Sequence, residues 1–302
     1  MTNRSSIAGI GYIVLSSFVF SLAATFATLS YDTGASPVGT LISRFTIASL
    51  VALIARWILK KGTPWPPRST IVKLLAYGGV GYFLGALFYF TALQSIDSSL
   101  AIVLFNCYPL FVVALNWVLF KNKPTAAIAL TLTLTIVGVA ITAGQVGTGN
   151  TTAVLLCIGA ALLYTTYALG TSRVLSTTDV LTGTALVMSG SAISFWLFWL
   201  IGGDHVDVTF PEGGWGWTWI VLLATFSSIG GTAFFFAGLN RIGASKSAIV
   251  STSEPVMAIA AGVVFLGESL SVSRIIGATF VVSALVLLAV LERRPAPSPV
   301  YQ

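Results

Sequence analysis

Two stretches decide the fold: FYFTALQSIDSSLAIVLFNCYPLFVVA at residues 88–114 and FFFAGLNRIGASKSAIVSTSEPVMAIA at residues 234–260. They align without a gap at an offset of 146 residues, and Pro109 falls in register with Pro255. Apolar segments resemble one another easily by chance. An ungapped match that runs across a loop and keeps both prolines in register instead indicates an internal repeat.

The composition around these stretches is that of a membrane protein. Of the 302 residues, 56% are apolar and only 8% are charged, and the mean hydropathy is +0.94. A soluble domain carries about 25% charged residues, so this chain has too little polar surface to face water. The net charge of +6 is therefore interpreted as a signal of membrane topology and not of nucleic-acid binding. Both cysteines, Cys107 and Cys157, lie in apolar runs and are expected to be buried thiols.

A membrane-spanning helix needs about 20 apolar residues, and ten such segments are present. We expect an all-α membrane protein of ten transmembrane helices, arranged as two inverted five-helix repeats in residues 1–146 and 147–302. Each half has an odd number of spans, so the second half enters the membrane from the opposite side. The expected spans are residues 7–29, 38–59, 71–93, 98–119, 125–144, 152–173, 180–201, 216–238, 244–266 and 272–291.

The basic residues set the direction of these spans. With the N-terminus in the cytoplasm, thirteen of the fifteen Lys and Arg residues fall on the cytoplasmic side. This asymmetry predicts a multi-pass protein of a bacterial-type inner membrane with both termini in the cytoplasm. The loop that carries His205 is expected outside.

The residues also resemble a known family. The stretch FYFTALQSIDSSLAIVLFNCYP, its second copy and the early LISRFTIASL resemble the two EamA-type halves of the drug/metabolite transporter superfamily. The second copy keeps an LGE ending at Glu268 and a GA at residues 277–278, whereas the first copy reads LFKNKPT where the family usually has an acidic residue. Ten spans with cytoplasmic ends make the chain similar to YddG-type exporters of amino acids. The resemblance implies secondary transport by alternating access.

Tyrosines and small polar residues form a candidate substrate cavity. Tyr82 and Tyr89 share a helix face by their spacing, and Asn106 aligns with Thr252 of the second copy. An apolar cavity with a few hydroxyl groups suits a substrate with an apolar side chain and a polar head. Ordinary packing is the simpler interpretation of any one tyrosine, whereas the group together favours a cavity. The candidate lining is Tyr82, Tyr89, Asn106, Tyr164, Tyr167, Ser251 and Glu254.

Glycines and prolines mark candidate hinges. Proline removes a backbone donor and kinks a helix, and Pro255 lies about 16 Å into its expected span at 1.5 Å per residue. Glycine weakens a helix, but it also permits close helix packing, and the sequence leaves both interpretations open. The candidate hinge residues are Gly81, Gly85, Pro109, Gly230, Gly231 and Pro255.

Two charges lie within expected spans. Glu254 is deep in the ninth span, where a carboxylate costs about 2.5–3.5 kcal/mol to insert. It either faces a cavity, where it titrates or meets a substrate ammonium, or it pairs with Arg44 of the second span. We expect the hydroxyl groups of Ser251–Ser253 to hydrogen-bond its carboxylate, and Pro255 to bend the helix beside it.

These patterns predict a secondary transporter that exports small amphiphilic metabolites, foremost amino acids including aromatic ones. A multidrug or other metabolite carrier of the same fold is the alternative, and a non-transport membrane protein is a more distant one. The chain shows no metal-ligand cluster, nucleophile motif or phosphate-binding loop, so we expect no enzyme activity, no metal and no cofactor. The expected partners are a small-molecule substrate and the lipid bilayer, with no nucleic acid; the oligomeric state is left open.

Overall fold

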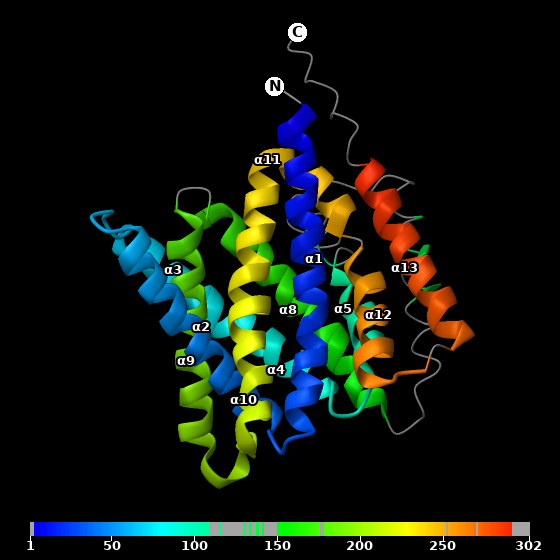
Figure 1. Cartoon of the computed structure of the whole chain (residues 1–302), viewed down its shortest axis with the longest axis horizontal. Coiled ribbons are helices and arrows are strands. Elements are labelled where there is room, and N and C mark those ends of the chain that lie inside the picture. The colour runs from blue at the N-terminus through cyan, green and yellow to red at the C-terminus, as the bar shows by residue number, and fades with distance from the viewer. Residues whose placement is uncertain are drawn as a thin grey trace.

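The computed structural model describes residues 3–108, 150–175, 178–251, 253–269 and 271–291, with scattered residues between 109 and 149. The regular structure of these residues is helical, and the long helices lie side by side as one bundle (Figure 1). Most of the fifth expected span, most of the second half of the fourth, and Pro109 lie outside the described residues.

The first repeat contains two long helices followed by a more complex third and fourth segment. The third expected span is a continuous helical run whose middle is a π-helix, and the fourth begins after a short turn. The elements are α1 (Asn3–Tyr31), α2 (Pro37–Leu59), α3 (Arg68–Ala76), the π-helix η1 (Tyr77–Tyr82), α4 (Phe83–Ala92) and α5 (Ser98–Phe105).

The second repeat follows a similar plan with one difference. The first repeat has a turn at residues 93–97, whereas one helix, Gly231–Ser251, runs unbroken through residues 239–243, so the expected connection there between the eighth and ninth spans was wrong. Here too a π-helix interrupts one long run, and a break precedes the next helix. The elements are α8 (Thr151–Leu175), α9 (Val180–Gly202), the short 3-10 helix η3 (Gly203–His205), α10 (Gly213–Leu222), the π-helix η4 (Leu223–Gly230), α11 (Gly231–Ser251), α12 (Glu254–Leu266) and α13 (Val272–Leu291).

Five helical runs of the described residues are long and apolar enough to cross a membrane. They match the first, second, third, seventh and eighth expected spans within a few residues. Shorter apolar helices cover parts of the sixth, ninth and tenth expected spans. The five runs are Ile7–Tyr31, Pro37–Leu59, Arg68–Ala92, Val180–His205 and Gly213–Phe235.

The repeat is visible in the backbone as a pair of π-helices. η1 starts at Tyr77 and η4 starts at Leu223, which is the same 146-residue offset that aligns the sequences. Each π-helix interrupts an otherwise α-helical run, and Ser228 Oγ donates to the Leu223 carbonyl five residues earlier at 3.1 Å. Single π-turns inside α-helices occur frequently at functional sites, so these two segments are candidate points of bending.

A second pair of matched features breaks the fourth and ninth expected spans. α5 ends at Phe105 and α11 ends at Ser251, again 146 residues apart, and the chain is helical again at Tyr108 and Glu254. The expectation of one continuous helix over residues 244–266 was therefore wrong. Pro255 does not kink a helix interior: it lies in the first turn of α12, where its missing N–H has no carbonyl partner to lose.

Polar side chains satisfy the backbone at these breaks. Asn106 Nδ2 donates to the Ile102 carbonyl at 2.9 Å, and Ser253 Oγ donates to the Val250 carbonyl at 2.8 Å. Backbone polar groups in a membrane interior must be paired within the protein, so a break inside an apolar segment requires such side chains. This is why polar residues interrupt two of the most apolar stretches of the chain.

The start of α9 is fixed by Asp179, which lies outside the spans. Its carboxylate accepts hydrogen bonds from the Thr182 N–H at 3.1 Å and the Thr182 hydroxyl at 2.6 Å. Burial acts to raise the pKa of Asp179, but these hydrogen bonds, with the nearby Lys60 and Arg56 cations, outweigh it and hold the pKa below its usual value. Arg56 Nε donates to the same Thr182 hydroxyl at 2.7 Å, which ties α2 to α9.

The arrangement of the helices makes the predicted sidedness testable. α1 begins and α13 ends at one end of the bundle, whereas the connection from α9 to α10 lies at the opposite end (Figure 1). A cysteine placed at the exposed position of His205 should react with a membrane-impermeant maleimide added outside intact cells, because the basic residues put this end outside. The native Cys107 and Cys157 are buried and give little background. Labelling of His205→Cys only after the cells are opened would contradict the predicted orientation.

Candidate functional site

The candidate site is built where the broken helices meet the third expected span and α8. Tyr108 and Glu254 occupy equivalent positions of the two repeats, each as the first residue after a break and each followed by proline. The Glu254 carboxyl lies within electrostatic reach of the hydroxyl groups of Tyr89, Tyr108 and Tyr164. The two breaks therefore deliver a phenol and a carboxyl to the same part of the bundle.

Aromatic side chains from four elements form a continuous series of contacts around this place. Tyr82 stacks on Tyr167 with ring centroids 5.1 Å apart, and Tyr167 lies 5.8 Å from Tyr164. Phe105 then makes edge contacts with Tyr164 at 5.2 Å and with Tyr89 at 5.3 Å. We refer to these residues, with two further ring neighbours, as the aromatic cluster: Tyr82, Tyr89, Phe90, Phe105, Tyr108, Tyr164 and Tyr167.

Glycines allow η1 and α4 to lie close enough to α8 for these contacts. A Cβ on Gly81 would come within 3.0 Å of Tyr167 Cβ, a separation tighter than ordinary packing. A Cβ on Gly85 would meet Tyr164 and Leu163 at ordinary contact distances. Gly81 thus serves close approach of two helices at the aromatic cluster, which is the packing alternative that the sequence left open.

Arg44 of α2 lies at one edge of the cluster. Its Nε donates to Ser228 Oγ at 2.8 Å, and its Nη2 lies 3.5 Å from the Tyr82 hydroxyl. Its guanidinium carbon lies 5.0 Å from the centre of the Phe45 ring and 4.9 Å from that of Phe90. Tyr82 and Ser228 are equivalent residues of the two repeats, so one guanidinium group contacts the same position of both π-helices.

Glu254 is not the partner of Arg44. Both residues are described, and neither a hydrogen bond nor an ion pair joins them: Arg44 bonds to Ser228 and Tyr82 instead. Ser253 directs its hydroxyl to the Val250 carbonyl, so it does not hold the Glu254 carboxylate as expected from the sequence. Glu254 is half-buried and lies in the first turn of α12, where the positive end of the helix dipole favours a carboxylate.

The structure brings together most of the residues proposed for the cavity. Tyr82, Tyr89, Tyr164 and Tyr167 belong to the aromatic cluster, and Glu254 lies beside it. Asn106 is buried and turns its amide to its own helix, and Ser251 is the half-buried last residue of α11. Of the candidate hinge residues, Gly81 and Gly230 lie in the π-helices, Gly85 lies in α4 and Gly231 follows η4.

Sequence reasoning missed Phe90, Phe105, Tyr108 and Ser228. Phe90 and Phe105 look like any other apolar residues of a span, and no local signal marks them. Tyr108 and Ser228 could have been found from the sequence, because the 146-residue offset pairs them with Glu254 and Tyr82, which were already candidate site residues.

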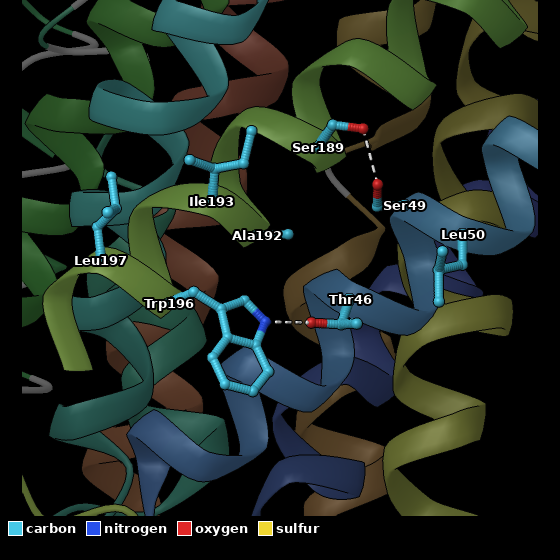
Figure 2. A pocket seen from close by; sticks show the side chains of 8 residues that line it. All are labelled: Thr46, Ser49, Leu50, Ser189, Ala192, Ile193, Trp196 and Leu197. Carbon is cyan, nitrogen blue, oxygen red and sulfur yellow. Dashed lines mark hydrogen bonds between the residues drawn. The ribbon is translucent and has the colours of Figure 1, made fainter. Parts of the chain in front are cut away.

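A groove on the outside of the bundle is lined by none of the residues of the aromatic cluster. It has a volume of about 400 Å³ and lies between α2 and α9 (Figure 2). Its two polar pairs are satisfied internally, since Ser49 and Ser189 share a hydrogen bond of 2.7 Å and Trp196 Nε1 donates to Thr46 Oγ1 at 2.9 Å. With exposed Leu50 and other apolar residues around them, the groove offers lipid chains a surface and offers a polar solute no free partner.

The carboxylate of Glu268 joins the two repeats at the N-terminus of α5. Glu268 Oε1 accepts from the N–H and the hydroxyl of Ser98, both at 2.7 Å. Glu268 Oε2 accepts from the Ser99 N–H at 3.2 Å and also from the Ser99 hydroxyl. The Glu268 of the LGE motif therefore caps the N-terminus of a helix from the other repeat, where the helix dipole favours negative charge.

The fold and the site together define a class. Apolar helices of membrane-spanning length, matched helix breaks in two repeats, and a polar and aromatic site beside those breaks are the architecture of a membrane transporter.

Comparison with known proteins gives the family. The profile of the EamA-like transporter family matches residues 7–144 and 151–290, so the chain belongs to this family of the drug/metabolite transporter superfamily. Two proteins of Bacillus subtilis, the uncharacterized transporters YyaM and YwfM, are each 25% identical to it over 292 residues; the matches cover 94% of this chain, and 95% and 94% of theirs. An uncharacterized transporter of Synechocystis is 26% identical over 219 residues, covering 70% of this chain and 65% of its own length. One solved crystal structure shares the fold, with a TM-score of 0.65 and 20% identity over 97% of this chain and all of the other.

The cap on α5 yields a stability prediction. Glu268→Gln should lower the free energy of unfolding by about 1–2 kcal/mol, because an amide cannot accept four hydrogen bonds and turns an N–H toward other donors. Thermal unfolding of the detergent-solubilised protein measures the loss. Glu212→Gln is the matched control: Glu212 is an exposed residue at the N-cap of α10 that makes no side-chain cap bond. Equal melting temperatures for the two variants would show that the cap contributes no stability.

Proposed function

We propose that this protein exports small amphiphilic metabolites, foremost amino acids including aromatic ones, across the inner membrane of a bacterium. The observation that carries the proposal is the aromatic cluster beside Glu254. Aromatic faces attract both apolar rings and ammonium groups, and a carboxyl at the same place supplies a partner for an ammonium. A free amino acid with an aromatic or branched side chain offers both kinds of group.

Five of the seven side chains of the aromatic cluster are partly exposed, which supports a binding role. Tyr82, Phe105, Tyr108, Tyr164 and Tyr167 all keep partial exposure, although they lie among the helices of the bundle. A purely structural cluster would gain most by complete burial, since the burial of apolar surface stabilises by about 25 cal/mol per Å². Rings that remain partly open are suited to the reversible burial of a substrate.

The matched π-helices and breaks support alternating access. A π-turn and a helix break are the points of a helical run at which bending costs the least backbone hydrogen bonding. Each repeat has one of each, at equivalent positions, and both pairs of features adjoin the aromatic cluster or Arg44. In the proposed cycle the halves of the third and eighth spans bend at η1 and η4, and the site opens alternately to the two sides.

Glu254 has a specific task in this proposal. Its carboxyl makes no hydrogen bond with the described residues, and it lies within reach of three tyrosine hydroxyl groups. We assign it to the substrate ammonium, or to a proton that replaces the ammonium when the site is empty. In either role, the charge of the Glu254 site changes during the transport cycle.

Reconstitution tests the proposal. Proteoliposomes containing the purified protein should take up labelled phenylalanine or leucine by exchange against the unlabelled amino acid. Glu254→Gln should slow exchange at least tenfold and flatten its dependence on pH, because the neutral amide neither titrates nor pairs with an ammonium. Glu212→Gln should leave exchange unchanged.

Two results would count against this function. Movement of lipophilic cations such as ethidium, with none of amino acids, would favour the multidrug carrier instead. Amino-acid exchange that Glu254→Gln leaves unchanged in rate and pH profile would remove Glu254 from the site while keeping the substrate class.

A further inference from the structure

Arg44 has more hydrogen-bond donors than the protein uses. A guanidinium group carries five N–H donors and cannot lose its charge inside a protein. Arg44 is only 4% exposed, yet it donates to one serine at 2.8 Å and lies 3.5 Å from one tyrosine hydroxyl, and no carboxylate approaches it among the described residues. A buried cation without an anion is costly, so an anion from outside the described residues would stabilise this charge.

The neighbouring groups add to the surplus of donors. In the described part of the chain, three buried side-chain oxygens have no hydrogen-bond partner, and the Tyr89 hydroxyl is one of them. Tyr89 is only 8% exposed, and its hydroxyl interacts electrostatically with both Arg44 and Glu254. A second is Ser227 Oγ, on the residue beside the serine that holds Arg44. The Tyr89 hydroxyl thus adds an unpartnered donor to those that Arg44 leaves unused in the described part of the chain.

The architecture of the repeat does not itself require an arginine here. α2 and α9 correspond at an offset of 143 residues, because Pro37 and Val180 begin them, Leu59 and Gly202 end them, and Ser36 and Asp179 cap them. The residue of α9 that corresponds to Arg44 is therefore Val187, an apolar side chain that is only 2% exposed. One repeat thus fills this position with a buried apolar side chain, and the other fills it with a charge. The asymmetry points to function rather than packing.

We propose that Arg44 binds the carboxylate of the exported substrate. A carboxylate offers acceptors for the unused guanidinium N–H groups in the planar, two-bonded geometry that arginine favours, and it gives the Tyr89 hydroxyl an acceptor as well. The substrate ring then contacts the aromatic cluster, and the ammonium lies toward Glu254. This inference rests on the proposed function and narrows it: the substrates carry a carboxylate, and binding is weaker for amines that lack one.

Ligand-induced stabilisation of the purified protein tests the inference apart from transport. Three probes share one ring: phenylalanine, phenylacetate without the ammonium, and phenethylamine without the carboxylate. Phenylalanine and phenylacetate should raise the melting temperature of the wild-type protein in a saturable way, because a ligand that binds only the folded state stabilises it. Arg44→Gln should weaken both at least tenfold in apparent Kd and change phenethylamine less than twofold.

Two further variants separate binding from folding. Arg56→Gln removes another buried arginine, one that lies away from the cluster near the start of α9, and should leave all three apparent Kd values unchanged. Tyr89→Phe deletes only the unpartnered hydroxyl and should weaken phenylacetate severalfold with little loss of thermal stability, since that hydroxyl has no protein partner to lose. If Arg44→Gln does not fold, Arg44→Lys takes its place and should weaken both carboxylates by losing the two-bonded geometry.

The outcomes distinguish this inference from the proposed function. No stabilisation of the wild-type protein by phenylacetate, or equal stabilisation of the wild type and Arg44→Gln, overturns the carboxylate site. Stabilisation by phenylacetate that Arg44→Gln abolishes, in a protein that exchanges no amino acid, keeps the anion site and overturns the amino-acid function.

Discussion

A backbone inside a membrane must satisfy its own polar groups, and the rest of this structure depends on that constraint. A continuous helix meets it automatically, whereas an interrupted helix needs partners for each freed group. At the breaks after Phe105 and Ser251, the side chains of Asn106 and Ser253 donate hydrogen bonds to backbone carbonyls. The Thr165 hydroxyl likewise donates to the Tyr108 carbonyl at 3.1 Å. The polar residues that look out of place in apolar segments are what permits the breaks. The breaks in turn place Tyr108 and Glu254 at helix starts inside the bundle.

Arg44 links this central region to the two π-helices. It contacts Ser228 of η4 and Tyr82 of η1, and Tyr82 stacks on the aromatic cluster. A change at the guanidinium group therefore reaches both candidate bending points and the proposed binding surface through direct contacts. The corresponding residue of α9, Val187, has an apolar side chain that cannot do the same, so the two repeats share a backbone plan but not a role. This difference between the side chains of the two repeats lets a transporter built from similar halves bind an asymmetric substrate.

The sequence was sufficient for the class of fold and insufficient for its interruptions. Apolar length predicted the spans that the structure describes as membrane-length helices, and the 146-residue offset predicted which helices correspond. The π-helices were missed because α- and π-helical segments have the same apolar composition. The breaks were mistaken for kinks because proline fits both the interior of a kinked helix and the first turn of a new one. Four tyrosines of the site were found from the sequence: Tyr82, Tyr89, Tyr164 and Tyr167. Tyr108 was missed, and so were Phe90 and Phe105, because only the tertiary packing distinguishes these two from other apolar residues.

The most direct test of the central claim is the position of a bound substrate that contains a heavy atom. A crystal of the protein grown with 4-bromophenylalanine would show the bromine by its anomalous scattering. The account predicts the bromine among Tyr89, Tyr108 and Tyr164, with the amino-acid head between Arg44 and Glu254. A bromine found only in the outer groove between Trp196 and Leu50, with none at the aromatic cluster, would contradict it.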